Sequence, residues 1–374
     1  MRRAPAFDMP LLFCFLILVG LGITFIYTAS YPKAMAESGG SSSFLFAGKQ
    51  ILFACMGLVA MFACMHIPLA FFHRHTKFLG TLIIALLVVV LVWGTAKHGN
   101  KAWIPLGPFQ FQPSEFAKVA LMLILPAYIA EHPWSIRSWK GLFTGPYLII
   151  GVPLVLIAVG DMGTATVFAF ASVALMAVAG TKFRFWGVPL LALISLAAIV
   201  ILSGHRVNRI EAWRHPFDES IQESYQPRNS LIAVGSGTMF GRGFCMSRQK
   251  WFYLPGAHND YILAIIAEEL GFVFMLLFLF VPYLFMIFRG FTVAHRAPDE
   301  YSALVAAGCT IMLTTQALVN MAVVTNLIPC IGMNMPFISY GGTSLIASMM
   351  MAGLLLNVSG MRTGKQSRTS PKTA

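Results

Sequence analysis

Residues 11–29 have the sequence LLFCFLILVGLGITFIYTA, which contains no charged side chain. A helix needs about 20 mostly apolar residues to cross the hydrocarbon core of a bilayer. Similar apolar runs follow at 50–72, 78–95, 116–130, 146–160, 163–180, 185–203, 260–288, 302–326 and 339–360. The sequence therefore predicts an all-α, polytopic integral membrane protein of about ten transmembrane helices.

The composition points to the same class of protein. Hydrophobic residues make up 57% of the 374 residues, charged residues only 11%, and the mean hydropathy is +0.75. Soluble domains carry about 25% charged residues. The net charge of +12 does not indicate nucleic acid, because no nucleic-acid-binding motif accompanies it. The six cysteines are scattered and show no metal-ligand spacing.

The distribution of Lys and Arg sets the expected orientation. With the N-terminus in the cytoplasm, fourteen of the 26 lie in cytoplasmic segments and five in short outer loops. The other seven lie in a long outer loop, where the charge rule is weaker. We expect a cytoplasmic-membrane protein with both termini inside, one membrane domain over 1–361 and a disordered basic tail over 362–374.

The long outer loop, 204–259, is rich in aromatic residues and in Arg. So much aromatic surface predicts an ordered loop that packs at the membrane interface. Arg side chains match phosphate geometry, so this loop suits a lipid-linked phosphate or pyrophosphate. The glycine-rich stretch 235–243 is a weak further candidate for phosphate contact through its backbone amides.

Ten of the fourteen acidic residues fall on the outer side of this topology. Asp260 opens an apolar helix, and two interpretations are evenly balanced: it caps the first turn, or it acts as a general base. For Glu268 and Glu269, two turns deeper, we expect at least one to pair with Lys or Arg. Asp161 lies between two apolar runs and is interpreted as a turn residue.

The stretch GPFQFQPSEFAK at 107–118 has both a structural and a functional interpretation. Ser114 is positioned to cap the next helix, and Glu115 falls in its first turn. Lys118 can pair with Glu115 across one turn. The functional alternative is that Lys118 faces a polar cavity and meets an anionic substrate group.

Five segments, in one order, resemble the SEDS family of bacterial cell-wall glycan polymerases. They are KAWIPLGPFQFQPSEFAK at 101–118, GDMGTA at 160–165, YQPRNSLIAVGSGTMFGRGF at 225–244, LPGAHNDYILAIIAEELG at 254–271 and VNMAVVTNLIPCIGMNMPFISYGGTS at 319–344. The last segment resembles FtsW and SpoVE more than RodA, which indicates septal or spore-wall synthesis.

The resemblance implies a peptidoglycan glycosyltransferase that polymerises lipid II at the outer face of the membrane. It implies inversion at the anomeric carbon, with undecaprenyl pyrophosphate as the leaving group. Asp260 matches the family's essential acid and is the expected catalytic residue. The expected substrate-binding residues are Lys118, Glu115, Lys101, Trp103, Arg242, His258 and Glu268.

The expected partners are a class B penicillin-binding protein and other division proteins. Mg²⁺ or Mn²⁺ is a candidate cofactor from the resemblance alone, since the sequence shows no metal-ligand cluster. Two departures limit the transfer of roles: Lys101 stands where relatives carry an Arg-rich stretch, and Gly256 where they often have Glu.

Two other functions are alternatives: a lipid II flippase, and a non-catalytic scaffold for the transpeptidase. A flippase needs polar groups through the whole membrane depth. Gln316 and Asn320 lie inside an apolar run, and interhelical hydrogen bonding is the favoured explanation for both. A scaffold would tolerate substitution of Asp260 and Lys118.

Overall fold

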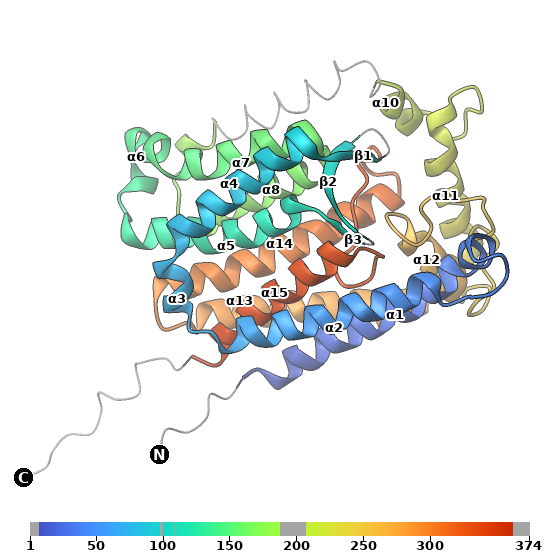
Figure 1. Ribbon diagram of the computed structural model, residues 1–374, viewed down its shortest axis with the longest axis horizontal. Coiled ribbons are helices and arrows are strands. Elements are labelled where there is room, and N and C mark those ends of the chain that lie inside the picture. The colour runs from blue at the N-terminus through green and yellow to red at the C-terminus, as the bar shows by residue number, and fades with distance from the viewer. Residues whose placement is uncertain (1–6, 98–99, 108, 188–206, 362–374) are drawn as a thin grey trace, which may run out of the picture.

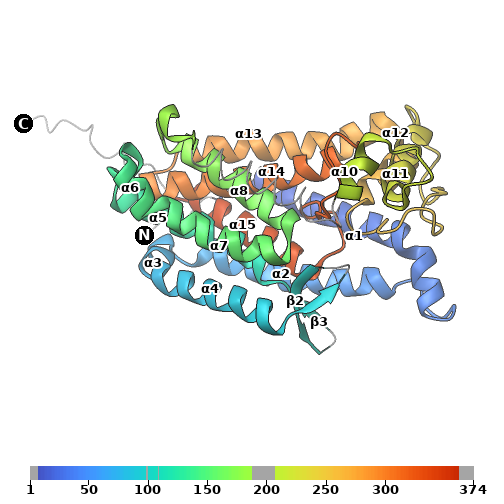
Figure 2. The same cartoon turned by 90° about the horizontal axis from the view of Figure 1, so that it is seen from above.

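The computed structural model describes residues 7–97, 100–107, 109–187 and 207–361. The predicted span at 185–203 lies mostly outside these residues, and the tail 362–374 lies wholly outside them. The long apolar helices form a bundle whose axes run along the long dimension of the molecule (Figures 1 and 2).

The elements follow the apolar runs closely. In chain order they are α1 (Met9–Glu37), α2 (Leu45–His66), α3 (Leu69–Arg74), α4 (Thr76–Trp93), β1 (Thr95–Lys97), β2 (Asn100–Leu106), β3 (Phe109–Phe111), α5 (Pro113–Glu131), η1 (Ser135–Arg137), α6 (Trp139–Thr144), α7 (Pro146–Gly160), α8 (Met162–Val178), η2 (Phe183–Phe185), α10 (Val207–Arg214), η4 (Gln222–Ser224), α11 (Tyr225–Gly237), α12 (Ile262–Met275), the π-helical η5 (Leu276–Phe280), α13 (Val281–His295), α14 (Glu300–Val324) and α15 (Gly342–Ser359).

Within the described ranges, seven helical stretches are long and apolar enough to cross a membrane, with α12, η5 and α13 counted as one 34-residue span. The helices α7 and α8 are shorter but equally apolar. The all-α prediction is confirmed. It missed one feature, a small antiparallel sheet of order β1-β2-β3 that lies between α4 and α5.

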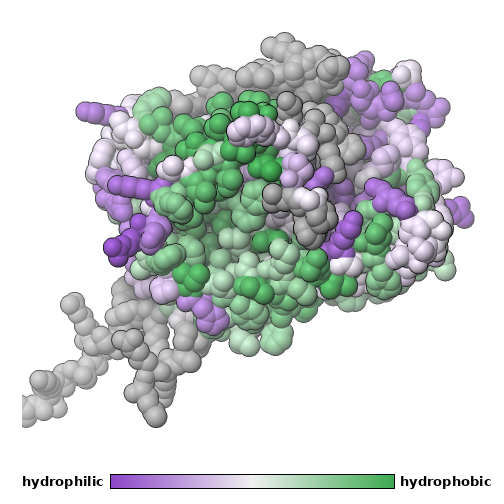
Figure 3. All heavy atoms as spheres, in the orientation of Figure 1, coloured by the Kyte–Doolittle hydropathy of each residue, from purple (hydrophilic) through white to green (hydrophobic). Residues whose placement is uncertain are grey.

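The centre of the bundle is formed by α5, α14 and α15, whose side chains are mostly buried. Large apolar side chains on α2, α4, α7 and α13 face outward, and Figure 3 shows an apolar band between two hydrophilic ends. An apolar outer surface is costly in water but matches the hydrocarbon core of a bilayer.

The two ends of the bundle differ. The start of α1 and the end of α15 lie at the same end of the bundle. The amide of Asp8 donates there to Ser359 Oγ at 3.0 Å. The Asp8 carboxylate also pairs there with Arg289 at 3.0 Å. The sheet and the segments α10 and α11 lie at the opposite end (Figures 1 and 2). The part of the predicted outer loop within 207–259 is ordered, as expected, and contains α10, η4 and α11.

Candidate functional site

The polar residues of the sheet-bearing end converge on the first turns of α5 and α8. The α5 helix begins with Pro113, which is favoured at the first helical position because its missing amide would be unpaired anyway. Its N-cap residue is Gln112, and Ser114 Oγ has no partner among the described residues, so the predicted capping role of Ser114 is wrong.

Lys118 and Glu115 form a fully buried ion pair inside the bundle. Their Nζ and Oε2 atoms are 2.8 Å apart, which confirms the predicted pairing across one turn. Lys118 Nζ also donates to Gln316 Oε1 at 2.7 Å, and Gln316 Nε2 donates to the Asn334 carbonyl at 2.9 Å. The hydrogen-bonding role favoured for Gln316 is therefore confirmed. This chain of bonds joins α5, α14 and the 326–341 segment.

Asp161 is the single residue between α7 and α8, and it caps α8 through the amide of Thr164 at 3.2 Å. The predicted turn is confirmed. Its carboxylate also accepts from Thr164 Oγ1 at 2.6 Å and from Gln112 Nε2 at 2.8 Å. Position 163 has no room for a side chain, because a Cβ there would lie 2.5 Å from the Ile331 carbonyl oxygen. Asp161 is thus buried, satisfied and held against the 326–341 segment.

Asp260 is placed differently, in the turn before α12. That helix has Tyr261 as its N-cap residue and no capping side chain, so the capping interpretation of Asp260 is wrong. Asn320 Nδ2 fixes its backbone by donating to the Asp260 carbonyl at 2.7 Å and to the Met333 carbonyl at 2.6 Å. Among the described residues, no group donates to the Asp260 carboxylate, and the residue is half-buried.

The environment of Asp260 disfavours its charged form. Burial raises the pKa of Asp260 to about 6, the charge of Asp161 adds to the rise, and Arg209 opposes it. A carboxylate without donors and with a pKa near neutrality is suited to accept a proton, because a base works best when its pKa lies near the ambient pH. Asp161 accepts three hydrogen bonds, and burial raises its pKa as well, so the two carboxylates differ in their donors and not in the direction of their pKa shift.

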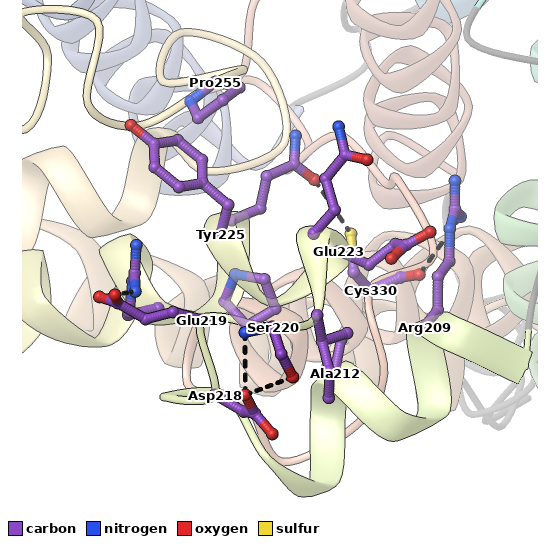
Figure 4. A pocket seen from close by; sticks show the side chains of 14 residues that line it. Arg209, Ala212, Asp218, Glu219, Ser220, Glu223, Tyr225, Pro255 and Cys330 are labelled. Atoms are coloured by element: carbon purple, nitrogen blue, oxygen red, sulfur yellow. Dashed lines mark hydrogen bonds and ion pairs between the residues drawn. The ribbon is translucent and has the colours of Figure 1, made fainter.

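Arg209 lines a cavity of about 760 Å³ (Figure 4), and its charge opposes the rise in the pKa of Asp260. Its Nη1 donates to the Cys330 carbonyl at 3.5 Å. The cavity is walled by α10, by residues 218–223 and by the start of α11, and Pro255 and Cys330 close it on the side of the Asp260 turn. The sequence alone does not distinguish Arg209 from the other loop cations or indicate the role of Gln112, because only the fold shows which cation and which amide lie near the carboxylates.

Glu268 and Glu269 hold the outer segment against α12. The Glu268 carboxylate accepts from Ser247 Oγ at 2.5 Å and from the amides of Arg248 and Gln249 at 3.1 and 3.2 Å. Glu269 pairs with Lys250 at 2.9 Å, so the expected internal pairing is confirmed. Glu268 is 1% exposed and therefore binds the protein's own loop in this structure.

The glycine-rich stretch packs closely on the same turns of α12. A Cβ at Gly237 would lie 1.9 Å from the Ala267 carbonyl. The amides of Arg242 and Gly243 donate to the carbonyls of Glu268 and Glu269, both at 3.0 Å. These two amides are thus already bonded, which argues against the hypothesis that they hold a phosphate. Arg242 Nε also lies 3.6 Å from Glu268.

Replacing Glu268 with Ala would leave the Ser247 hydroxyl and two backbone amides without their acceptor. Each such loss costs about 1–3 kcal/mol in a buried setting. We expect a lower unfolding temperature and faster proteolysis between residues 239 and 253, with Glu37→Ala as an exposed control. Unchanged stability and unchanged cleavage would contradict this role of Glu268.

Three further residues are predicted to contact substrate: His258, Lys101 and Trp103. The ring of His258 is buried, 4.9 Å from Phe46 and 5.7 Å from Tyr340 between centroids. Burial, with the charge of Lys33, lowers the pKa of His258 to about 3, so it is neutral. Lys101 and Trp103 lie on β2, next to the strand that leads into α5. Substrate contact by these residues stays a prediction.

A dedicated metal site does not fit the described residues. No group of three or more His, Cys, Asp or Glu within them is arranged to hold an ion. Asp161 already accepts three hydrogen bonds, and Glu115 is paired with Lys118. Of the carboxylates of Glu115, Asp161 and Asp260, that of Asp260 is the one without a donor among the described residues.

Comparison with known proteins places the chain in context. Residues 9–364 match the family of cell cycle proteins that comprises FtsW, RodA and SpoVE. The chain is 36% identical to stage V sporulation protein E of Bacillus subtilis, over 94% of this chain and 96% of that protein. It is 38% identical to a probable peptidoglycan glycosyltransferase FtsW of Geobacter sp. strain M18, over 96% and 98%.

Solved structures agree with the fold. RodA of Thermus thermophilus superposes with a TM-score of 0.69 at 27% identity, over 95% of this chain and 97% of that one. A chain from a peptidoglycan synthase complex, described as coordinating polymerization and crosslinking, has a TM-score of 0.77 at 26% identity, over 95% and 98%.

Proposed function

The chain belongs to the FtsW, RodA and SpoVE family and is a peptidoglycan glycosyltransferase, and on that premise we propose that it polymerises lipid II with Asp260 as general base. The observation that carries the proposal is the contrast between two neighbouring carboxylates. Asp161 accepts from three donors, whereas Asp260 accepts from none among the described residues. Burial raises the pKa of Asp260 to about 6.

The proposed reaction is a single displacement. Asp260 takes the proton from the 4-hydroxyl of the acceptor sugar as that oxygen bonds to the anomeric carbon of the donor. The bond from that carbon to the pyrophosphate breaks at the same time, and undecaprenyl pyrophosphate leaves with the electron pair. Attack opposite the leaving group inverts the anomeric centre. A positioned base of this kind contributes about 10²–10⁴-fold to a rate.

Cationic residues around Asp260 suit the pyrophosphate. The charge of Arg209 acts on Asp260, and its planar guanidinium fits phosphate oxygens. Lys118 is fully buried between Glu115 and Gln316. We therefore assign Lys118 a role in fixing the wall of the site, and direct contact with substrate would require it to leave these partners.

A divalent cation such as Mg²⁺ or Mn²⁺ would be held mainly by the substrate's phosphate oxygens. Mg²⁺ commonly takes one or two carboxylates and completes its shell with phosphates and water. No step above is routed through a metal.

The orientation and partners follow from the same proposal. The protein is a multi-pass membrane protein, and the distribution of Lys and Arg supports cytoplasmic termini and a site on the outer face. A structural neighbour from a synthase complex supports a penicillin-binding protein as partner, expected to be the class B transpeptidase. Sequence similarity to FtsW and SpoVE supports work in division or spore-wall synthesis.

The test is glycan formation from purified lipid II in proteoliposomes, with and without the cognate transpeptidase and Mg²⁺ or Mn²⁺. We expect polymer from the purified chain in at least one of these conditions. Absence of polymer in all of them, together with lipid II transfer between leaflets, would assign the flippase function instead. Absence of both activities, with intact binding to the transpeptidase, would assign the scaffold function.

A further inference from the structure

The segment 239–253 has a surface unlike that of a loop in water. Seven large apolar side chains between Met239 and Tyr253 are each more than half exposed, among them Phe240, Phe244 and Trp251. The exposed residues Arg242 and Arg248 lie among them. So many exposed large apolar side chains in one short segment indicate an interaction surface.

The depth of segment 239–253 can be measured along α1. The level of Asp8 is defined by its ion pair with Arg289 and its bond to Ser359. The ring of Phe244 contacts that of Phe25, with centroids 6.1 Å apart. At 1.5 Å per residue, Phe25 lies about 26 Å from Asp8 along the helix.

A second aromatic contact lies further along α1. The ring of Trp251 contacts Tyr31, with centroids 6.3 Å apart, and Tyr31 lies about 35 Å from Asp8 by the same rule. On the other side, the amide of Arg242 is bonded to the carbonyl of Glu268. Between Glu268 and Arg289 the helix is interrupted at Gly271 and is π-helical over Leu276–Phe280, so the depth is taken from α1. The segment therefore lies about one hydrocarbon thickness, roughly 30 Å, from the Asp8–Arg289 level.

We propose that segment 239–253 lies in the headgroup and acyl boundary of the leaflet next to Asp260, as an interfacial anchor that binds a lipid surface. Aromatic side chains with adjacent Arg are the composition that this boundary favours. The guanidinium groups of Arg242 and Arg248 match lipid phosphates. Exposure of these apolar side chains to water is unfavourable. A protein partner that covers them is the alternative, and the test must distinguish it from a lipid surface.

The anchor bears on the active site through α12. Segment 239–253 is bonded to Glu268 and Glu269 of α12, two turns after Asp260. The lipid surface therefore sets the height of Asp260 above the membrane. The inference rests on the membrane-spanning fold, so it stands even if the proposed reaction fails.

Cys245 offers a native reporter within the segment, because its thiol is free and exposed. A nitroxide is attached there in a Cys55→Ser background, since Cys55 is the other exposed cysteine among the described residues.

The accessibility of the label to oxygen and to a water-soluble nickel chelate is compared in liposomes of phosphatidylethanolamine and phosphatidylglycerol. The reference is Ser41→Cys, exposed in the turn after α1, made with Cys55→Ser and Cys245→Ser. The Cys55→Ser, Cys245→Ser chain gives the background labelling.

We expect the oxygen-to-nickel ratio at Cys245 to exceed that at residue 41 severalfold in liposomes without any partner. Equal ratios at the two positions would overturn the proposal. A label at Cys245 that is accessible to water in liposomes, and protected only when the transpeptidase is added, would also overturn it and assign the patch to that partner.

Discussion

Asp260→Asn is expected to lower the rate of glycan polymerisation by about 10²–10⁴-fold, the contribution of a positioned general base. Asn keeps the size and shape of the side chain but cannot accept the proton of the acceptor hydroxyl. The backbone position of Asp260 is held by Asn320 and does not depend on its carboxylate. The substitution should therefore leave the unfolding temperature unchanged or raise it, because it removes a charge that burial disfavours.

The measurement is polymer formed from lipid II under matched protein and lipid amounts. Glu37→Gln serves as the control, since Glu37 is an exposed acid paired only with Lys33 on the same helix. We expect the control to keep the wild-type rate. Asp260→Asn protein that polymerises at the wild-type rate would remove Asp260 from the mechanism.

Lys118→Ala is expected to be the most destabilising single change in the site. It leaves the Glu115 carboxylate buried without its cation and removes the donor to Gln316. Breaking a buried pair on one side costs about 3–5 kcal/mol. The loss would appear as a large fall in unfolding temperature in detergent.

Two variants show whether the unpaired charge is the cause. Glu115→Gln with Lys118→Met removes both charges and should recover most of the lost stability. Lys33→Ala breaks an exposed pair at 3.8 Å and should cost less than about 1 kcal/mol. If Lys118→Ala is as stable as Lys33→Ala, the buried pair does not hold the site together.

The apolar runs were enough to predict most of the bundle, because membrane-spanning helices are long and their composition is constrained. The predicted run 146–160 coincides with α7, and 302–326 is displaced by two residues from α14. The sheet was missed because each of β1 and β3 has only three residues, too few for a period-two pattern.

The site was predicted unevenly, for a physical reason. The Glu115–Lys118 pair is local, and helical spacing alone brings its members together. Other proximities depend on how distant segments pack. Asp161 and Arg209 act on Asp260 from other parts of the chain, and Arg209 donates to the Cys330 carbonyl. The cap predicted at Ser114 and the capping alternative for Asp260 are both wrong, because the N-cap residues are Gln112 and Tyr261, two residues before and one residue after these positions.

The pH dependence of the first bond formed between two lipid II molecules tests the account most directly. It should be measured for the wild type and for Asp161→Asn. Asp260 acts only when deprotonated, so the wild-type kcat/KM should fall as the pH drops below about 6. Asp161→Asn removes a charge that raises the pKa of Asp260, so its acid limb should move to lower pH. An acid limb at the same pH in both proteins, or a rate that rises as the pH falls, would contradict Asp260 as the base.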